Sequence, residues 1–188
     1  MPLERASLAE AMQLHGELEE PIPAAAWRWI DTFIEAFGAQ APDVESALPE
    51  VAALRAESAI VPALALERLR NRQVVFFLDA VSQYVDAQAE LRGLPLDHDL
   101  GAIADEFGIV HDDARWAVRV ALTGREQGPD LGLLFVLLGH DRILMRIGAI
   151  SSHLLHGRGL QPLAFGPGGE PFRTIEPHQP STARRCDA

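Results

Sequence analysis

Apolar residues recur every three or four positions along most of this chain, with glycine or proline between the repeating stretches. The clearest repeat lies in residues 131–138, where four apolar side chains fall on one face of a helix: Leu131, Leu134, Phe135 and Leu138. Strand patterns alternating with helix patterns, which a parallel sheet requires, do not occur in the sequence. Alanine and leucine, which both favour helices, are abundant. The sequence therefore predicts an all-α fold, a bundle of helices.

Glycines and prolines divide this pattern into separate predicted helices. Pro62 lies inside one apolar stretch, so we expect a kink or two shorter helices there. Residues 74–78 alone are compatible with a strand, but the helical spacing continues through Tyr84 and Leu91 and favours a helix. Residues 39–49, which are rich in proline and acidic residues, are interpreted as a linker. The predicted helices span residues 3–19, 24–37, 50–72, 73–93, a short stretch within 94–109, 113–123, 130–138 and 140–155.

The segment 123–130 reads "TGREQGPD" and predicts a corner between two helices. Gly124 suits a helix end, because glycine readily adopts the left-handed conformation found there. Pro129 and Asp130 suit the first turn of the next helix, where proline needs no amide donor and a carboxylate faces the positive end of the dipole. Gly139 is the predicted end of that second helix.

The chain divides into three predicted parts. Residues 1–93 form an N-terminal helical subdomain, residues 94–156 a C-terminal helical subdomain, and residues 157–188 an extended or disordered tail rich in glycine and proline. The apolar runs are far shorter than the roughly 18 residues that cross a bilayer, and the N-terminus lacks the pattern of a secretory signal. The single cysteine cannot form an intramolecular disulfide. We therefore expect a cytoplasmic protein with no membrane partner.

Charge is unevenly distributed along the sequence. The formal net charge is -11, and all sixteen basic residues are arginine. Residues 1–67 hold three arginines against twelve acidic residues, a net charge of -9, whereas residues 115–185 hold nine arginines against five acidic residues, a net charge of +4. An acidic chain generally repels nucleic acid, so any phosphate contact is expected in the C-terminal part. Chemistry that needs a lysine amine is excluded.

Each candidate enzyme motif in the sequence lacks residues or spacing that its chemistry requires. The corner lacks the lysine and the spacing of a phosphate-binding loop, and "FGPGGEP" at 165–171 lacks the spacing of a dinucleotide fingerprint. His153 and His156 are three positions apart, but no further metal ligand is predicted beside them, so they are interpreted as surface histidines. Cys186 has no predicted base nearby. We therefore predict no catalytic residue, no metal, no cofactor and no small-molecule substrate.

Five arginines lie on or beside the predicted corner. Arg115 and Arg119 are one helical turn apart, Arg142 and Arg146 are one turn apart on a later helix, and Arg125 lies in the corner itself. If the two helices pack side by side, these residues form one basic face, which suits phosphate because guanidinium groups make planar, two-point contacts. The alternative is that Arg115 pairs with Asp112 and Arg142 with a neighbouring acidic residue, while other arginine stems cover the core.

The corner also carries a family resemblance. Residues 100–147 resemble the C-terminal anticodon-binding subdomain of bacterial glutamyl-tRNA synthetases, in which R-x-A-x-T-G, a loop ending in proline, a helix ending in Leu-Gly and an Arg-Ile pair follow in order. A weaker likeness, with an apolar-Pro pair, Glu-Arg and Phe76-Phe77, extends the resemblance to residues 22–155. The matching residues are Arg119, Ala121, Thr123, Gly124, Pro129, Leu131, Leu138, Gly139, Asp141, Arg146 and Ile147.

The resemblance implies the helix cage of a class I synthetase anticodon-binding domain, in a free-standing protein without the catalytic domain, since the synthetase signature motifs are missing. It implies tRNA as the partner, bound at the anticodon region without catalysis. The alternative is a helical protein-interaction or structural module that has lost RNA binding and docks onto a synthetase-like protein. Asp130 and the overall acidity depart from what RNA binding favours. The implied RNA-contact candidates are Arg115, Arg119, Thr123, Arg125, Arg142 and Arg146.

Overall fold

A computed structural model describes residues 3–156 of the chain. All regular secondary structure in this range is helical, which confirms the predicted all-α class. The predicted tail, residues 157–188, lies outside the described residues. The helices are α1 (Arg5–Leu14), α2 (Ala24–Phe37), α3 (Val44–Arg55), α4 (Ala63–Leu69), α5 (Arg72–Asp86), α6 (Leu96–Glu106), α7 (His111–Thr123) and α8 (Leu131–His156).

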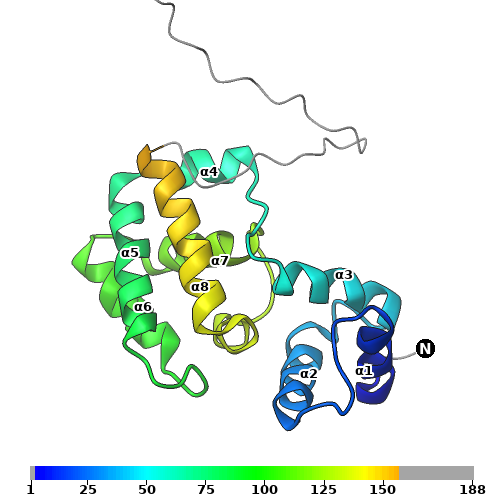
Figure 1. Ribbon diagram of the computed structural model, residues 1–188. Coiled ribbons are helices and arrows are strands. Elements are labelled where there is room, and N and C mark those ends of the chain that lie inside the picture. Colours follow the sequence, from blue (N-terminus) through cyan, green and yellow to red (C-terminus); the bar gives the residue numbers. More distant parts are fainter. Residues whose placement is uncertain (1–2, 157–188) are drawn as a thin grey trace, which may run out of the picture.

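The helices form two groups that meet along α8 (Figure 1). Helices α1, α2 and α3, here called the N-terminal helices, pack against one another at one side of the molecule. Helices α4 to α8, the C-terminal helices, form the larger group, in which α5 and α8 lie side by side and make the most extensive contact. Both α2 and α3 also contact α8. The predicted division of the chain after residue 93 stays a prediction.

One contiguous apolar core runs through the described helices. The four residues with the clearest helical spacing are buried as predicted, with Leu131, Leu134 and Phe135 fully inaccessible to solvent and Leu138 nearly so. Burial of each such side chain contributes about 1.5–3 kcal/mol to stability. Within the described range, none of the helices has the length and apolar character needed to span a bilayer.

The structure corrects three predicted boundaries. Residues 44–49, predicted as linker, form the first turns of α3, because the Asp43 carboxylate accepts a hydrogen bond from the Ser46 amide at 2.9 Å and caps the helix. Pro49 lies inside this helix without ending it. Helix α1 ends at Leu14 rather than near residue 19, and α5 ends at Asp86 rather than near residue 93.

Other predicted boundaries are confirmed. Pro62 separates α3 from α4 as the N-cap of α4, so the apolar stretch forms two helices. Gly124 ends α7 with φ of 71°, the left-handed conformation expected there. Gly139, with φ of 71° and ψ of 169°, breaks α8 into two segments at the predicted place. The Trp29 indole of α2 donates a 2.8 Å hydrogen bond to the Leu137 carbonyl beside this break.

Candidate functional site

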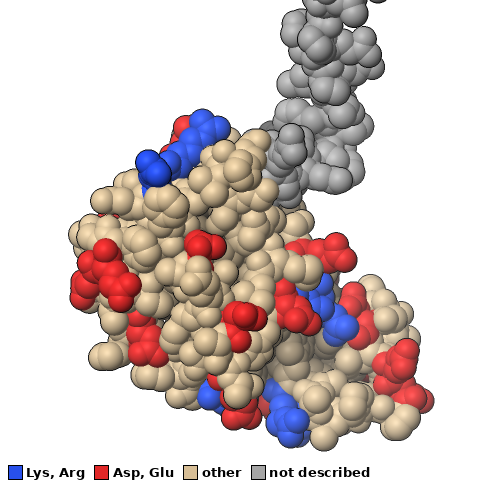
Figure 2. Space-filling model, turned by 60° about the vertical axis from the view of Figure 1, so that its left-hand side comes forward, with Lys and Arg blue, Asp and Glu red and all other residues tan. Residues whose placement is uncertain are grey.

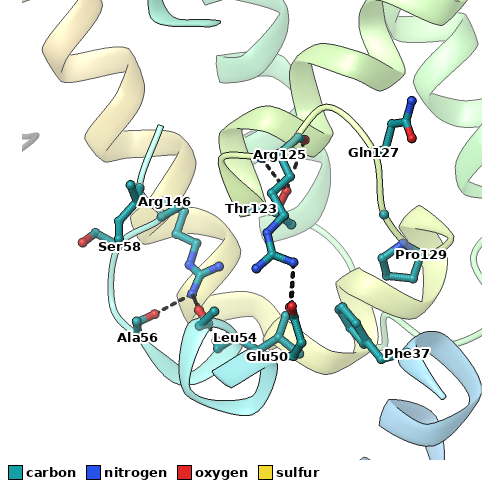
Figure 3. Close-up of a pocket in the computed structure, with 14 residues that line it drawn as sticks. Phe37, Glu50, Leu54, Ala56, Ser58, Thr123, Arg125, Gln127, Pro129 and Arg146 are labelled. Atoms are coloured by element: carbon teal, nitrogen blue, oxygen red, sulfur yellow. Dashed lines mark hydrogen bonds and ion pairs between the residues drawn. The ribbon is translucent and has the colours of Figure 1, made fainter. Parts of the chain in front are cut away.

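The corner between α7 and α8 borders a cavity of about 310 Å³ (Figure 3). One wall comes from residues 123–129 of the corner and from Arg146 of α8. The opposite wall comes from Phe37 at the end of α2, the last turns of α3 and the connector 56–60. The cavity therefore lies where the N-terminal helices meet the C-terminal helices, a common place for a binding site.

The connector and the corner are held close together at Gly124. An added β-carbon at this position would lie 1.8 Å from the Ile60 carbonyl oxygen. Only glycine therefore allows the connector to pass so near the end of α7, in addition to adopting the positive φ. Beside it, the Thr123 hydroxyl donates to the Arg119 carbonyl at 2.8 Å and accepts from the Arg125 amide at 3.1 Å. Thr123 thus fixes the corner backbone from which Arg125 extends.

Arg125 extends from the corner across the cavity to Glu50 of α3 (Figure 3). Its Nη1 atom lies 2.8 Å from Oε1 and 2.7 Å from Oε2 of the carboxylate. The Arg125 side chain is 52% exposed, whereas the Glu50 side chain is only 22% exposed. Both carboxylate oxygens share one guanidinium nitrogen, so the contact is not the paired fork in which two nitrogens each bind one oxygen. Arg125 is the accessible cation of this site.

Arg146 lies on the other side of the same cavity but is buried, with 2% of its surface exposed. Its Nη1 donates to the Leu122 carbonyl at 2.5 Å, and its Nη2 donates to the Ala53, Leu54 and Ala56 carbonyls at 2.8, 3.1 and 2.6 Å. These carbonyls belong to the C-terminal ends of α7 and α3, where helices leave acceptors unpaired and carry partial negative charge. Burial, with a smaller effect of neighbouring Arg142, lowers the pKa of Arg146 to about 10.

Two further arginines also bind main-chain carbonyls. Arg142 donates from Nε to the Arg55 carbonyl at 3.3 Å and so joins Arg146 at the end of α3. Arg119 donates from Nη1 to the Pro129 carbonyl within the corner. Burial, with a smaller effect of Arg115, lowers the pKa of Arg119. These half-buried guanidinium groups hold the backbone together around the corner.

The expectation of one exposed basic face therefore needs correction. Arg146 is buried, and Arg115, Arg119 and Arg142 are half-buried. Of the five, only Arg125 is exposed. Arg115 pairs with Asp97 at 2.8 Å, not with Asp112 as the alternative interpretation had it. The arginines do not form a free basic face because main-chain carbonyls and acidic side chains of the same molecule bind their guanidinium groups.

Acidic side chains outnumber arginines on one face of the molecule (Figure 2). Figure 2 shows acidic side chains scattered over one face of the molecule, with arginines at a few separate places. A polyanion that approaches this face meets no continuous positive surface. A phosphate contact on this face would depend on individual arginines.

The lining of the cavity mixes charged, polar and apolar groups. It combines an arginine–glutamate pair and the polar groups of Thr123 and Gln127 with apolar walls that include Phe37. Among residues 3–156, no three His, Cys, Asp or Glu side chains come together in a way that could hold a metal ion. Sequence reasoning missed Glu50, because 75 positions separate it from Arg125 and no spacing rule connects the two residues.

Comparison with known proteins agrees with this arrangement. No curated protein matches the chain. A family model described as the anticodon binding domain matches residues 27–150, which run from the first turn of α2 into the last part of α8 and include both walls of the cavity. Because the match covers well over half of the sequence and the helical fold agrees with it, the chain belongs to the anticodon-binding domain family.

Proposed function

We propose that this chain is a free-standing domain of the glutamyl-tRNA synthetase type that binds the anticodon region of tRNA and catalyses no reaction itself. The observation that carries the proposal is the family match over residues 27–150, which contains the corner with its R-x-A-x-T-G motif. On this proposal the protein acts in the cytoplasm and is at most an accessory to aminoacylation.

The corner supplies the contacts in this proposal. Arg125 is half exposed at the rim of the cavity, and Thr123 holds the backbone on which it stands. Arg115 is a second, partly exposed cation, on the same helix that leads into the corner. Arg119, Arg142 and Arg146 support the corner from within, through main-chain carbonyls, rather than by touching phosphate.

The test is a binding titration of total tRNA at low salt with the wild-type protein and the variant Arg125→Gln. Loss of one phosphate contact should weaken tRNA binding and reduce the slope of log K against log salt by about 0.7–0.9. Arg70→Gln is the matched control, because Arg70 is similarly exposed, at 59%, and also pairs with a glutamate, Glu67, at 2.9 Å. It should bind tRNA as the wild type does.

Two results would contradict this function. One is the absence of tRNA binding by the wild-type protein up to about 100 μM, the weak end of non-specific binding. The other is equal binding to tRNA and to heparin, since non-specific attraction to any polyanion would then explain the affinity. Equal weakening by Arg125→Gln and Arg70→Gln would exclude the corner as the contact surface.

The distribution of charge favours a second candidate, a protein-interaction module derived from the same domain. All five candidate arginines already have partners within the molecule, and acidic side chains outnumber arginines on the face in Figure 2. The partner on this alternative is a separate synthetase-like protein. Affinity purification from the native cell, with and without ribonuclease, separates the candidates: a protein partner that survives ribonuclease favours this one, and recovered tRNA alone favours the first.

A further inference from the structure

The Arg125–Glu50 contact joins the two groups of helices across the cavity (Figure 3). Glu50 belongs to α3 among the N-terminal helices, and Arg125 follows α7 among the C-terminal helices. Among the ion pairs of the described residues, it is the one whose partners come from different groups. The pair therefore holds the rim of the cavity together as well as neutralising the accessible cation of the site.

The carboxylate occupies the position that an incoming anion would take. Both of its oxygens lie within 2.8 Å of Arg125 Nη1, the nitrogen directed across the cavity. A phosphate that displaces the carboxylate must leave Glu50 without its partner. A phosphate that instead binds another nitrogen of the same guanidinium remains close to the negative charge of Glu50, and like charges at such short range repel. In either arrangement, the charge of Glu50 lowers the affinity for anions.

We propose that Glu50 is an autoinhibitory residue of this site: it competes with phosphate for Arg125 and keeps the corner closed against polyanions until RNA displaces it. This inference rests on the proposed RNA-binding function, and it adds how binding at that site is regulated. It also accounts for the pairing of an accessible arginine with a carboxylate inside the region that matches the family.

The alternative role for Glu50 is to position Arg125 for RNA, and the two roles differ in sign. A competitor lowers RNA affinity, so removal of its charge strengthens binding. A positioning residue raises RNA affinity by holding the guanidinium in the binding orientation, so its removal weakens binding. The Arg125 backbone is already fixed by Thr123, which leaves only the side chain to be positioned by Glu50.

The test is the variant Glu50→Gln, which keeps the length of the side chain and removes its charge. We expect Glu50→Gln to bind tRNA about two- to fivefold more tightly than the wild type, the range that loss of a partly exposed ion pair allows. The double variant Glu50→Gln/Arg125→Gln should lose this gain. Glu67→Gln is the matched control, because Glu67 pairs with the exposed Arg70, and it should leave affinity unchanged.

A second measurement separates this inference from the proposed function. A double-mutant cycle of urea unfolding with Glu50→Gln and Arg125→Gln reports whether the pair exists in solution, without any RNA. A non-zero coupling, with tighter tRNA binding by Glu50→Gln, supports the inference. If the wild type binds tRNA and Glu50→Gln binds equally or more weakly, autoinhibition is overturned and the proposed function stands. If neither protein binds tRNA, both fail.

Discussion

The guanidinium Nη2 of Arg146 lies 2.8 Å from the main-chain carbonyl oxygen of Ala53, although 93 positions separate the two residues. Ala53 belongs to the last turn of α3, and Arg146 lies in the middle of α8. The same guanidinium also binds the Leu122 carbonyl near the end of α7. One buried cation thus joins the negative ends of two helices to a third helix, directly behind the cavity.

We expect Arg146→Met to destabilise the fold by at least about 3 kcal/mol, because it leaves several buried carbonyls without a donor. Arg142→Met is the control from the same helix: Arg142 is half-buried and makes one 3.3 Å hydrogen bond, so its loss should cost about 1 kcal/mol or less. Urea unfolding followed by tryptophan fluorescence measures both. Equal effects of the two substitutions would show that the buried hydrogen bonds of Arg146 contribute no more than an ordinary surface contact.

Gly124→Ala should destabilise the protein more than an ordinary glycine replacement in a left-handed turn. The added methyl group would lie 1.8 Å from the Ile60 carbonyl, so the connector must move away from the corner. Gly16 has nearly the same φ, 72°, but open space where the methyl group would lie, so Gly16→Ala isolates the conformational cost of about 1–2 kcal/mol. Thermal unfolding compares the two. A Gly124→Ala protein as stable as Gly16→Ala would contradict the close approach.

Local signals in the sequence were sufficient for much of the fold. The spacing of Leu131, Leu134 and Phe135 predicted a buried helix face, and Pro62 and Gly124 predicted helix boundaries, because periodicity and turn chemistry act within a few residues. Residues 44–49 were predicted as linker because the segment is rich in proline and acidic residues, but they form the start of α3. Asp43 and Ser46 form a capping box, a local signal that was present in the sequence.

The candidate site was only partly predictable, because its contacts are long-range. The corner at residues 123–129 followed from its glycines and Pro129, and the structure places it at the cavity. The helical spacing of Arg142 and Arg146 could not show that both face the end of α3, since their partners lie about 90 positions earlier in the chain. Spacing identifies which arginines share a face, but not whether that face meets solvent or a helix end.

Trp29→Phe should cost about 0.5–1.5 kcal/mol of stability, the usual contribution of one hydrogen bond. The substitution removes the indole N–H that donates to the Leu137 carbonyl beside the break in α8, but it keeps an aromatic ring for stacking on Phe33, whose centroid lies 5.5 Å away. Trp27→Phe on the same helix is the control, since the Trp27 ring lies against the Arg5 guanidinium of α1, 4.7 Å from the ring centroid. Urea unfolding by circular dichroism should show the larger loss for Trp29→Phe, and the reverse order would exclude this link between α2 and α8.

Tyr84 is the single tyrosine of the chain, so its ionisation can be followed directly by ultraviolet difference absorbance. Its hydroxyl donates a 2.5 Å hydrogen bond to Oδ2 of Asp99. Burial, followed by this hydrogen bond and the charge of Asp99, raises the pKa of Tyr84 to about 12. The native protein should therefore titrate near pH 12, whereas the urea-unfolded chain should titrate near the ordinary tyrosine value of about 10.

The same shift predicts how stability depends on alkaline pH. Because the pKa of Tyr84 is higher in the folded state, its contribution is fully present below pH about 10 and is lost as the pH rises to about 12. Tyr84→Phe should remove this part of the pH dependence. Asp99→Asn should lower the native pKa of Tyr84, because a neutral amide removes the repulsion of the phenolate while burial remains. Tryptophan fluorescence at each pH verifies that the protein is folded. A native titration near pH 10 would contradict both the burial of Tyr84 and its contact with Asp99.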